Sequence, residues 1–270
     1  MIQDDILVLD TVTKLGPSAL GKVAVAASHG GVYAGYLAAR NGVRGVILHN
    51  AGIGKDDAGI SALPYLDGLG IAGAVIDYRT ARIGDGAGMA ETGVISHVNT
   101  TARNAGCAPD QTVMVCANAM RSARSAGGEV AGYDEARFVL REDPGEPSVI
   151  GCDSTSLVKS GDEGHIVITA SHGDLLETSP TWGDRPNVLA AVFNDAGSDN
   201  PTRLPDLDTR GIAGATVSTE SARIGDARST YEDGVISHIN ETARARGARV
   251  RMSCIEFVER MIDSAGAEKA

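Results

Sequence analysis

The sequence has few aromatic residues and no excess of positive charge. Phe, Tyr and Trp make up 4% of the 270 residues, with a single Trp182, so a large aromatic ligand cage is not expected. Lys and Arg number 24 against 35 Asp and Glu, which gives a formal net charge of −11. Nucleic acids and anionic membranes attract surfaces rich in Lys and Arg. The composition therefore argues against both classes of partner.

Long apolar runs and closely spaced cysteines are also missing. No apolar stretch approaches the ~18 residues that a membrane-spanning helix needs. The start of the chain, MIQDDILVLD, carries acids and no basic segment, so no signal peptide is expected. The four cysteines lack the spacing of a disulfide scaffold or a zinc knuckle, and no HxxxH motif occurs. We expect a cytoplasmic protein without a metal or cofactor.

The chain does contain one stretch that occurs twice. Residues 71–103 and 212–244 are identical at 19 of 33 positions without a gap, at an offset of 141 residues. This period is too long for a solenoid repeat, whose units run about 20–50 residues. Many of the retained residues are polar, whereas packing alone retains an apolar pattern more readily. The sequence therefore predicts a domain-sized unit that is present twice.

The fold class follows from how the apolar runs alternate with helix-forming segments. Such alternation is typical of βαβ units and a mostly parallel sheet. We expect an α/β protein made of two tandem, pseudo-symmetric, three-layer units of about four strands each. The expected bounds are residues 1–130 and 152–270, with a linker at 131–151 that holds acid-rich turns and two prolines. Short apolar helices such as 32–40 would be the surfaces for a homo-oligomer.

Within the repeated stretch the apolar spacing predicts two helices and two strands. The helices are expected at Val94–Asn104 and Val235–Arg246, where apolar residues form a stripe. The strands are expected at Thr112–Val115 and Arg249–Ser253, and they would end in Cys116 and Cys254. These two cysteines are interpreted as buried small residues. A nucleophilic Cys beside a His on an α/β fold is the alternative.

Polar residues follow the first long strand of each half. Ser28-His29-Gly30-Gly31 follows an apolar run, and His172 stands at the matching place in the second half. Ligands of open parallel sheets bind at the carboxyl ends of strands. His29 would be a general base, Ser28 or water would attack, and the Gly30 and Gly31 amides would bind an oxyanion. A tight turn in which the His caps a backbone carbonyl is the alternative.

Two further loops carry candidate residues. Asn50 and the loop Gly52–Gly59 follow the next strand, and Lys55 in this Gly-rich loop can hold an anion while Asp56 supplies a base. A solvated turn before the next helix is the alternative. The repeated Ala-Arg-Ile-Gly-Asp loops hold Arg82 and Asp85 in the first half. Arg82 would bind a substrate carboxylate and Asp85 would orient a His or transfer a proton, unless the two form a structural ion pair.

These residues predict an enzyme that acts on a small carboxylate-bearing metabolite. The first hypothesis is a hydrolase of a C–N bond (amide or cyclic imide) or of an ester or lactone. The expected catalytic residues are Ser28, His29, Asp56 and Asp85, and the expected substrate contacts are Gly30, Gly31, Asn50, Lys55, Arg82, His172 and Arg223. The same residues would serve a cofactor-free isomerase, racemase or lyase. A non-catalytic metabolite-binding or scaffold subunit is the third alternative.

Overall fold

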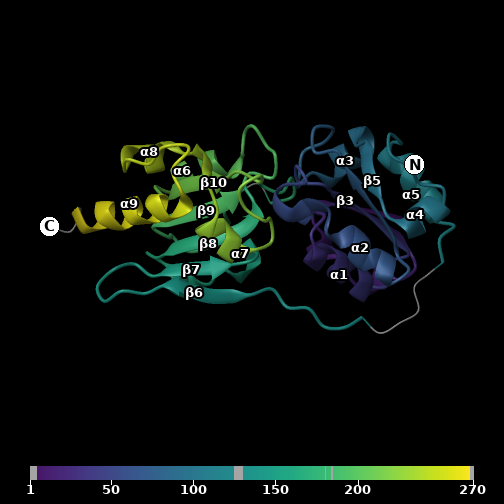
Figure 1. The fold of residues 1–270 in the computed structure, drawn as a ribbon, viewed down its shortest axis with the longest axis horizontal. Coiled ribbons are helices and arrows are strands. Elements are labelled where there is room, and N and C mark those ends of the chain that lie inside the picture. Colours follow the sequence, from purple (N-terminus) through teal and green to yellow (C-terminus); the bar gives the residue numbers. More distant parts are fainter. Residues whose placement is uncertain (1–4, 125–129, 180, 184, 268–270) are drawn as a thin grey trace. The chain divides into compact units, whose positions relative to one another are not determined.

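The computed structural model describes residues 5–124, 130–179, 181–183 and 185–267. The chain forms two compact units, each with its own sheet and hydrophobic core (Figure 1). Unit 1 consists of Met1–Ile53, Asp57–Asp134 and Leu176–Thr178, and unit 2 of Gly54–Asp56, Glu135–Leu175 and Ser179–Ala270.

Unit 1 is built on a five-stranded sheet whose strands follow one another in chain order. The strands are β1 (Ile6–Leu9), β2 (Val23–His29), β3 (Gly45–His49), β4 (Ala72–Ile76) and β5 (Ile95–Val98). β1 to β4 are parallel, and β5 pairs antiparallel with β4. The carboxyl ends of β1 to β4 therefore lie at one edge of this sheet.

Helices cover both faces of the unit 1 sheet. β2 contributes Ala24 and Ala26 to the face covered by α1 and α2, and Val23, Val25 and Ala27 to the face covered by α3, α4 and α5. This alternation gives a three-layer arrangement with small side chains between the layers. The helices are α1 (Val32–Arg40), α2 (Ala62–Gly68), α3 (Gly86–Thr92), α4 (Thr100–Asn104) and α5 (Val113–Met120), with 3-10 turns η1 (Val12–Lys14), η2 (Pro17–Ala19) and η3 (Lys55–Ile60).

Unit 2 is built on a six-stranded sheet in the order β11-β10-β9-β8-β7-β6. β7 to β10 are parallel, while β6 and β11 pair antiparallel at the two edges. The strands are β6 (Arg137–Arg141), β7 (Val149–Cys152), β8 (Ile166–His172), β9 (Ala190–Asn194), β10 (Ala213–Val217) and β11 (Ile236–Ile239). The helices are α6 (Arg203–Asp208), α7 (Ala227–Glu232), α8 (Glu241–Ala245) and α9 (Cys254–Ala267), with 3-10 turns η4 (Thr155–Leu157) and η5 (Ser160–Asp162).

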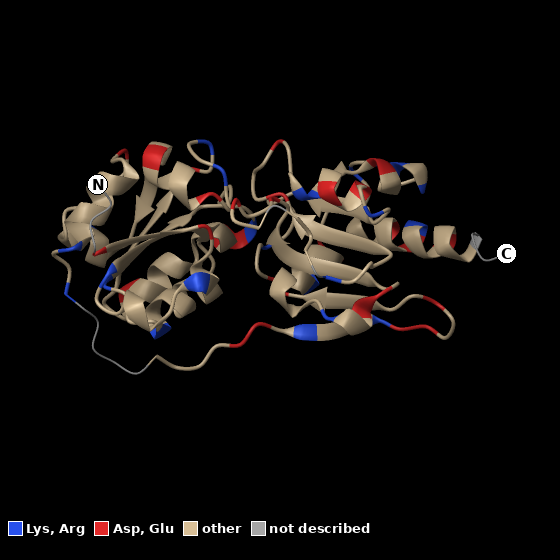
Figure 2. Ribbon diagram, turned by 180° about the vertical axis from the view of Figure 1, so that it is seen from behind, with Lys and Arg blue, Asp and Glu red and all other residues tan. Residues whose placement is uncertain are grey.

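The sheets confirm an α/β fold in two units, with sheets that are mixed but mostly parallel. In Figure 2 the charged residues lie on helices, loops and β6, and the inner strands are drawn as uncharged. Residues 131–151 hold β6 and the first residues of β7, and the expected domain bounds stay predictions. Within the described ranges, every helix is too short or too polar to span a bilayer.

The two helices expected inside the repeated stretch are wrong in their first halves. Val94–Asn104 contains β5 followed by α4, and Val235–Arg246 contains β11 followed by α8. Asn99 starts α4 as its N-cap, and Asn240 starts α8 in the same way. Each of these Asn side chains also bonds the neighbouring strand, through Gly73 N in unit 1. The apolar spacing fits a strand plus a short helix as well as it fits one long helix.

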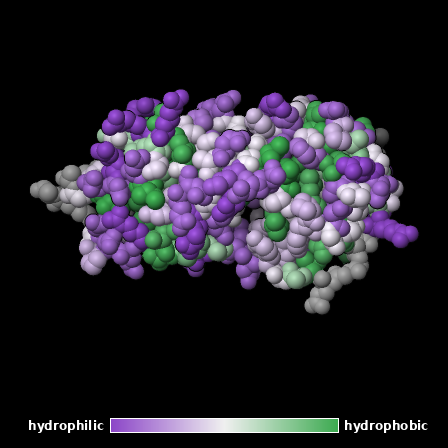
Figure 3. Space-filling view, in the orientation of Figure 1, coloured by the Kyte–Doolittle hydropathy of each residue, from purple (hydrophilic) through white to green (hydrophobic). Residues whose placement is uncertain are grey.

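The two strands expected before the cysteines are also wrong. Thr112 is the N-cap of α5, so Cys116 lies inside a helix, and Cys254 is the first residue of α9. Both cysteines are fully buried. Large exposed apolar side chains are dispersed over separate elements, as the mixed purple and green surface of Figure 3 shows.

Candidate functional site at the carboxyl ends of the strands

The Ala-Arg-Ile-Gly-Asp loop of unit 1 is bonded to two neighbouring strand ends. Gly84 N donates to Ala27 O in β2 at 2.8 Å. His49 Nε2, at the end of β3, lies 3.0 Å from Ala81 O. His29 and His49 are register neighbours in the sheet. The loop that carries Arg82 therefore lies against the strand ends that carry the two histidines.

His29 is a partly exposed, neutral side chain. Burial of the ring lowers the pKa of His29 to about 4, and the electrostatic interaction with the neighbouring His49 makes a smaller contribution. Its Nδ1 accepts a hydrogen bond from Gly31 N at 3.2 Å, so the neutral ring carries its proton on Nε2. In this state Nε2 is a hydrogen-bond donor and has no lone pair for a proton.

The two glycine amides are used inside unit 1. Gly30 N donates to His49 O at 2.7 Å, and Gly31 N donates to the His29 ring. A Cβ on Gly30 would lie 2.4 Å from Gly59 O, so the close approach of these two loops requires glycine at position 30. These contacts make both glycines part of the turn that presents His29.

Ser28 and Asn50 also bond to backbone groups of neighbouring loops. Ser28 Oγ accepts from Val12 N at 2.9 Å, and in unit 2 Ser171 Oγ accepts from Thr155 N at the same distance. Asn50 Oδ1 accepts from Gly52 N and Tyr78 N. The predicted roles of Ser28 as nucleophile and Asn50 as substrate contact stay predictions.

Arg82 and Asp85 make different contacts. The guanidinium of Arg82 pairs with Glu177 at 2.8 Å, and the two side chains are 32% and 66% exposed. Exposed ion pairs of this kind contribute about 0–1 kcal/mol to stability, and the predicted role of Arg82 in binding a substrate carboxylate stays a prediction. Asp85 Oδ1 accepts from Gly88 N at 2.8 Å and forms the N-cap of α3. Asp85 therefore fixes the end of the loop that carries Arg82.

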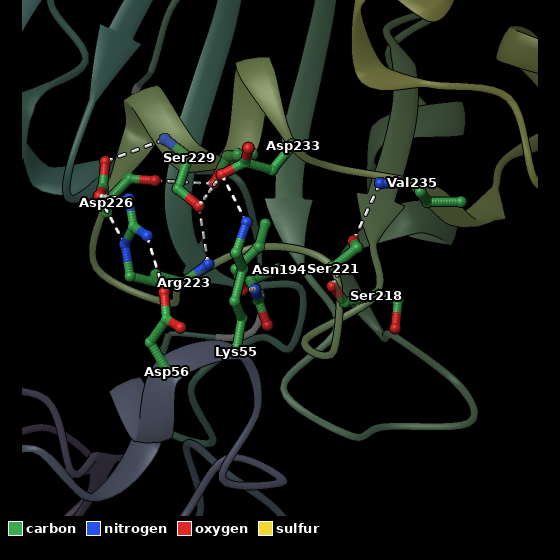
Figure 4. A network of polar contacts seen from close by, with 12 residues as sticks. Lys55, Asp56, Asn194, Ser218, Ser221, Arg223, Asp226, Ser229, Asp233 and Val235 are labelled. Carbon is green, nitrogen blue, oxygen red and sulfur yellow. Dashed lines mark hydrogen bonds and ion pairs between the residues drawn. The ribbon is translucent and has the colours of Figure 1, made fainter.

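Lys55, Asp56 and Arg223 belong to one polar network of unit 2 (Figure 4). Arg223 binds Asp56 at 2.9 Å and Asp226 at 3.0 Å, and Lys55 binds Asp233 at 2.8 Å. The hydrogen bonds that Arg223 donates to Asp56 and Asp226 raise the pKa of Arg223. Lys55 and Asp56 thus belong to unit 2, whereas His29 belongs to unit 1.

His172 stands at the end of β8, beside Asn194 at the end of β9. It is 9% exposed. The histidines at the matching strand ends of the two units are therefore both largely buried.

The sequence reasoning missed His49, which is fully buried. Its Nδ1 accepts from Ala51 N at 3.0 Å, and its Nε2 donates to Ala81 O. Burial lowers its pKa to about 4, against the opposing effects of the Ala81 carbonyl and of Asp77. One signal in the sequence could have found it. His49-Asn50-Ala51-Gly52 and Asn194-Asp195-Ala196-Gly197 stand at the ends of equivalent strands and share Ala-Gly, while their first two residues differ.

The chain after β3 has an unusual backbone. Ala51, Gly52 and Ile53 have φ angles of 48°, 77° and 66°, and Asp57 has a φ of 55°. A β-branched residue such as Ile53 rarely adopts positive φ, and such strain costs on the order of 1–3 kcal/mol per residue. Strained segments of this kind cluster at functional sites. The matching turn of unit 2 shares the start of this backbone, with φ angles of 53° at Ala196 and 79° at Gly197.

Within residues 5–124, 130–179, 181–183 and 185–267, no three His, Cys, Asp or Glu side chains gather as a metal-binding group. Comparisons of the chain with protein-family models, with curated proteins and with solved structures find no match. The functional argument therefore depends on the geometry of the residues described above.

Proposed function

We propose that unit 1 binds a small carboxylate-bearing metabolite at the carboxyl ends of β2 to β4 and hydrolyses a C–N or ester bond in it. The observation that supports this is the double attachment of the Arg82 loop, through Gly84 N to Ala27 O and through Ala81 O to His49. These two bonds hold the guanidinium of Arg82, whose ion pair with Glu177 is exposed, next to the end of β2. His29 lies at this strand end and is a neutral hydrogen-bond donor.

The chemistry assigned to His29 in this proposal is that of an electrophile. Its Nε2–H would donate to the carbonyl oxygen of the substrate and stabilise the negative charge that develops there. Arg82 would hold the substrate carboxylate. Water would add to the carbonyl carbon, and the amine or alcohol would leave with one of the water protons. His29 as a general base would first have to give up the hydrogen bond from Gly31 N.

A non-catalytic metabolite-binding or scaffold subunit is the second candidate. It is favoured because the amides of Gly30 and Gly31 and the hydroxyl of Ser28 already have partners inside the chain. A binding protein needs matched donors but no activated nucleophile. The two candidates share the same carboxylate site and differ only in turnover.

We also propose that the two units are pseudo-symmetric copies of one ancestral unit. β1 to β5 and β7 to β11 share their order and directions. The register of β4 with β5 matches that of β10 with β11, including the position of the irregularity. The expected homo-oligomer remains part of the proposal, but α1 is a poor candidate surface because its apolar residues Ala34, Ala38 and Ala39 are buried against the unit 1 sheet.

The test is an assay with probes that separate binding from turnover. Succinamate and succinimide are incubated with the protein, and ammonia or ring opening is followed by proton NMR. We expect hydrolysis that is lost in His29→Ala and kept in Asp226→Asn of unit 2. Saturable succinate binding without turnover of either probe would favour the binding protein. Exchange of the α-protons of succinate in heavy water would instead point to an isomerase or lyase.

A further inference from the structure

His49 and Asn194 make the same pair of hydrogen bonds in their own units. His49 Nδ1 accepts from Ala51 N at 3.0 Å, and Asn194 Oδ1 accepts from Ala196 N at 2.9 Å. On the other side, His49 Nε2 lies 3.0 Å from Ala81 O, and Asn194 Nδ2 donates to an alanine carbonyl at 3.1 Å. That alanine is Ala222, the counterpart of Ala81 in the repeated stretch.

The groups that each side chain joins lie in the two loops around the candidate site. Ala51 begins the left-handed backbone after β3, with a φ of 48°, and Ala196 begins the matching turn of unit 2 with a φ of 53°. Ala81 and Ala222 immediately precede the arginines of the two Ala-Arg-Ile-Gly-Asp loops. One side chain in each unit therefore joins the loop after one strand to the loop after the next.

The chemistry of these partners fixes the state of the His49 ring. A backbone N–H can only donate and a carbonyl can only accept, so Nδ1 must be unprotonated and Nε2 must carry the proton. An imidazolium would direct a second N–H at Ala51 N. The amide of Asn194 has one acceptor and one donor with no titratable proton. The neutral imidazole of His49 and the amide of Asn194 therefore each offer one acceptor and one donor to the same pair of backbone groups.

From this we infer that His49 is a positioning residue, a fixed donor–acceptor bridge that holds the strained chain after β3 and the Arg82 loop in register, and that Asn can replace it. The bridge itself follows from hydrogen bonds alone. Its effect on ligand binding rests on the proposed function of the carboxyl ends of β2 to β4.

The experiment compares His49→Asn with His49→Ala, and uses Asn194→Ala as the matched control in unit 2. Amide hydrogen exchange is measured for residues 51–53, 81–84, 196–197 and 222–225. We expect His49→Ala to speed the exchange of Ala51 and Gly84 by about tenfold to a hundredfold, the scale of losing a buried hydrogen bond. His49→Asn should remain within about threefold of the wild type. Asn194→Ala should speed exchange at Ala196 and Gly225 and leave Ala51 unchanged.

Two further readouts keep the inference falsifiable if an alanine variant does not fold. Nitrogen-15 NMR of the wild-type protein at pH 7 should show a neutral His49 ring with its proton on Nε2. The opposite tautomer, or an exchange defect in His49→Asn as large as in His49→Ala, would overturn the bridge. Succinate affinity of His49→Asn should match the wild type. If the bridge is confirmed and the wild type does not bind succinate, the proposed function fails and the positioning role stands.

Discussion

The carboxyl ends of the two sheets carry the same histidine in different surroundings. In unit 1, His29 is partly exposed and is followed at once by α1. In unit 2, the described residues between His172 and β9 (173–179, 181–183 and 185–189) contain no helix, and Trp182 is fully buried there. The indole of Trp182 meets Phe193 edge to face at 5.9 Å between ring centroids, and the Arg203 guanidinium lies 5.1 Å from the centroid of Phe193. Packed aromatic side chains thus lie against β9 in unit 2, whereas α1 packs against the corresponding face of the sheet in unit 1.

The two arginines of the repeated loops, Arg82 and Arg223, also differ in their ion pairs. Arg223 has two carboxylate partners, Asp56 and Asp226, whereas the ion pair of Arg82 is with the exposed Glu177. Exposed ion pairs such as Arg82–Glu177 contribute about 0–1 kcal/mol, and the two carboxylates on Arg223 give it two such pairs. This difference is the reason that the proposed ligand site is placed in unit 1 and not in unit 2.

The largest expected effect comes from removing the two histidines separately. His29→Ala should lower hydrolysis of succinamate by about 100-fold or more, the range for a positioned hydrogen-bond donor, with little change in melting temperature. His172→Ala should leave hydrolysis in place and cost about 1–3 kcal/mol of stability, because a buried side chain is lost. Thermal unfolding and hydrolysis kinetics of both variants show which of the two units carries the proposed activity. A larger kinetic defect in His172→Ala would reverse the assignment.

The second-largest expected effect is a loss of folding stability at low pH that is caused by His49. Its pKa is lowered from 6.5 to about 4 in the folded protein. Below pH 6.5 the unfolded chain therefore takes up a proton that the folded protein refuses until about pH 4, and stability is lost as the pH falls through this window. The shift corresponds to about 3 kcal/mol of unfolding free energy.

Urea unfolding of the wild type and of His49→Asn at pH 7 and pH 4.5 isolates this contribution. Asp10 has no interaction with His49 and cancels in the difference, whereas Asp77 and His29 interact with His49 and contribute a smaller part of it. The wild type should lose about 2–3 kcal/mol more than His49→Asn between the two pH values. Equal losses in the two proteins would mean that His49 is not held neutral by burial.

A smaller effect on kcat/KM is expected when the planar guanidinium of Arg82 is replaced by the ammonium group of Lys. Arg82→Lys keeps the charge but loses the planar fork, so kcat/KM should fall by an equivalent of about 1–3 kcal/mol while the melting temperature stays unchanged. Arg223→Lys in unit 2 is the matched control, and it should leave kcat/KM unchanged. A drop in melting temperature for Arg82→Lys without a kinetic change would instead identify a structural ion pair.

The smallest effect is expected from the partner of Arg82. Glu177→Gln removes the carboxylate that competes with the ligand, so succinate should bind up to about fivefold more tightly, in line with the 0–1 kcal/mol of an exposed pair. Isothermal titration measures the change. Weaker binding in Glu177→Gln would show that Glu177 supports the site and does not compete for it.

The architecture could be predicted because strands buried on both faces stand out as apolar runs, as in residues 23–27 and 45–48. Residues 94–104 could not be assigned correctly, because the apolar spacing of Ile95 and Val98 also suits a helix, and only the bonds of Asn99 to the next strand mark the break. His49 was missed because its counterpart is an Asn. Matching residue identities between the halves cannot detect two residue types that make the same hydrogen bonds.

The measurement that tests the central claim most directly is a nitrogen-15 NMR titration of the protein with C2 to C6 mono- and dicarboxylates. We predict saturable shifts at residues 27–31 and 81–85 for at least one of them, abolished in His29→Ala and weakened in Arg82→Lys. Shifts confined to the matching residues of unit 2, or no saturable shift at the carboxyl ends of β2 to β4 with any of these acids, would contradict it.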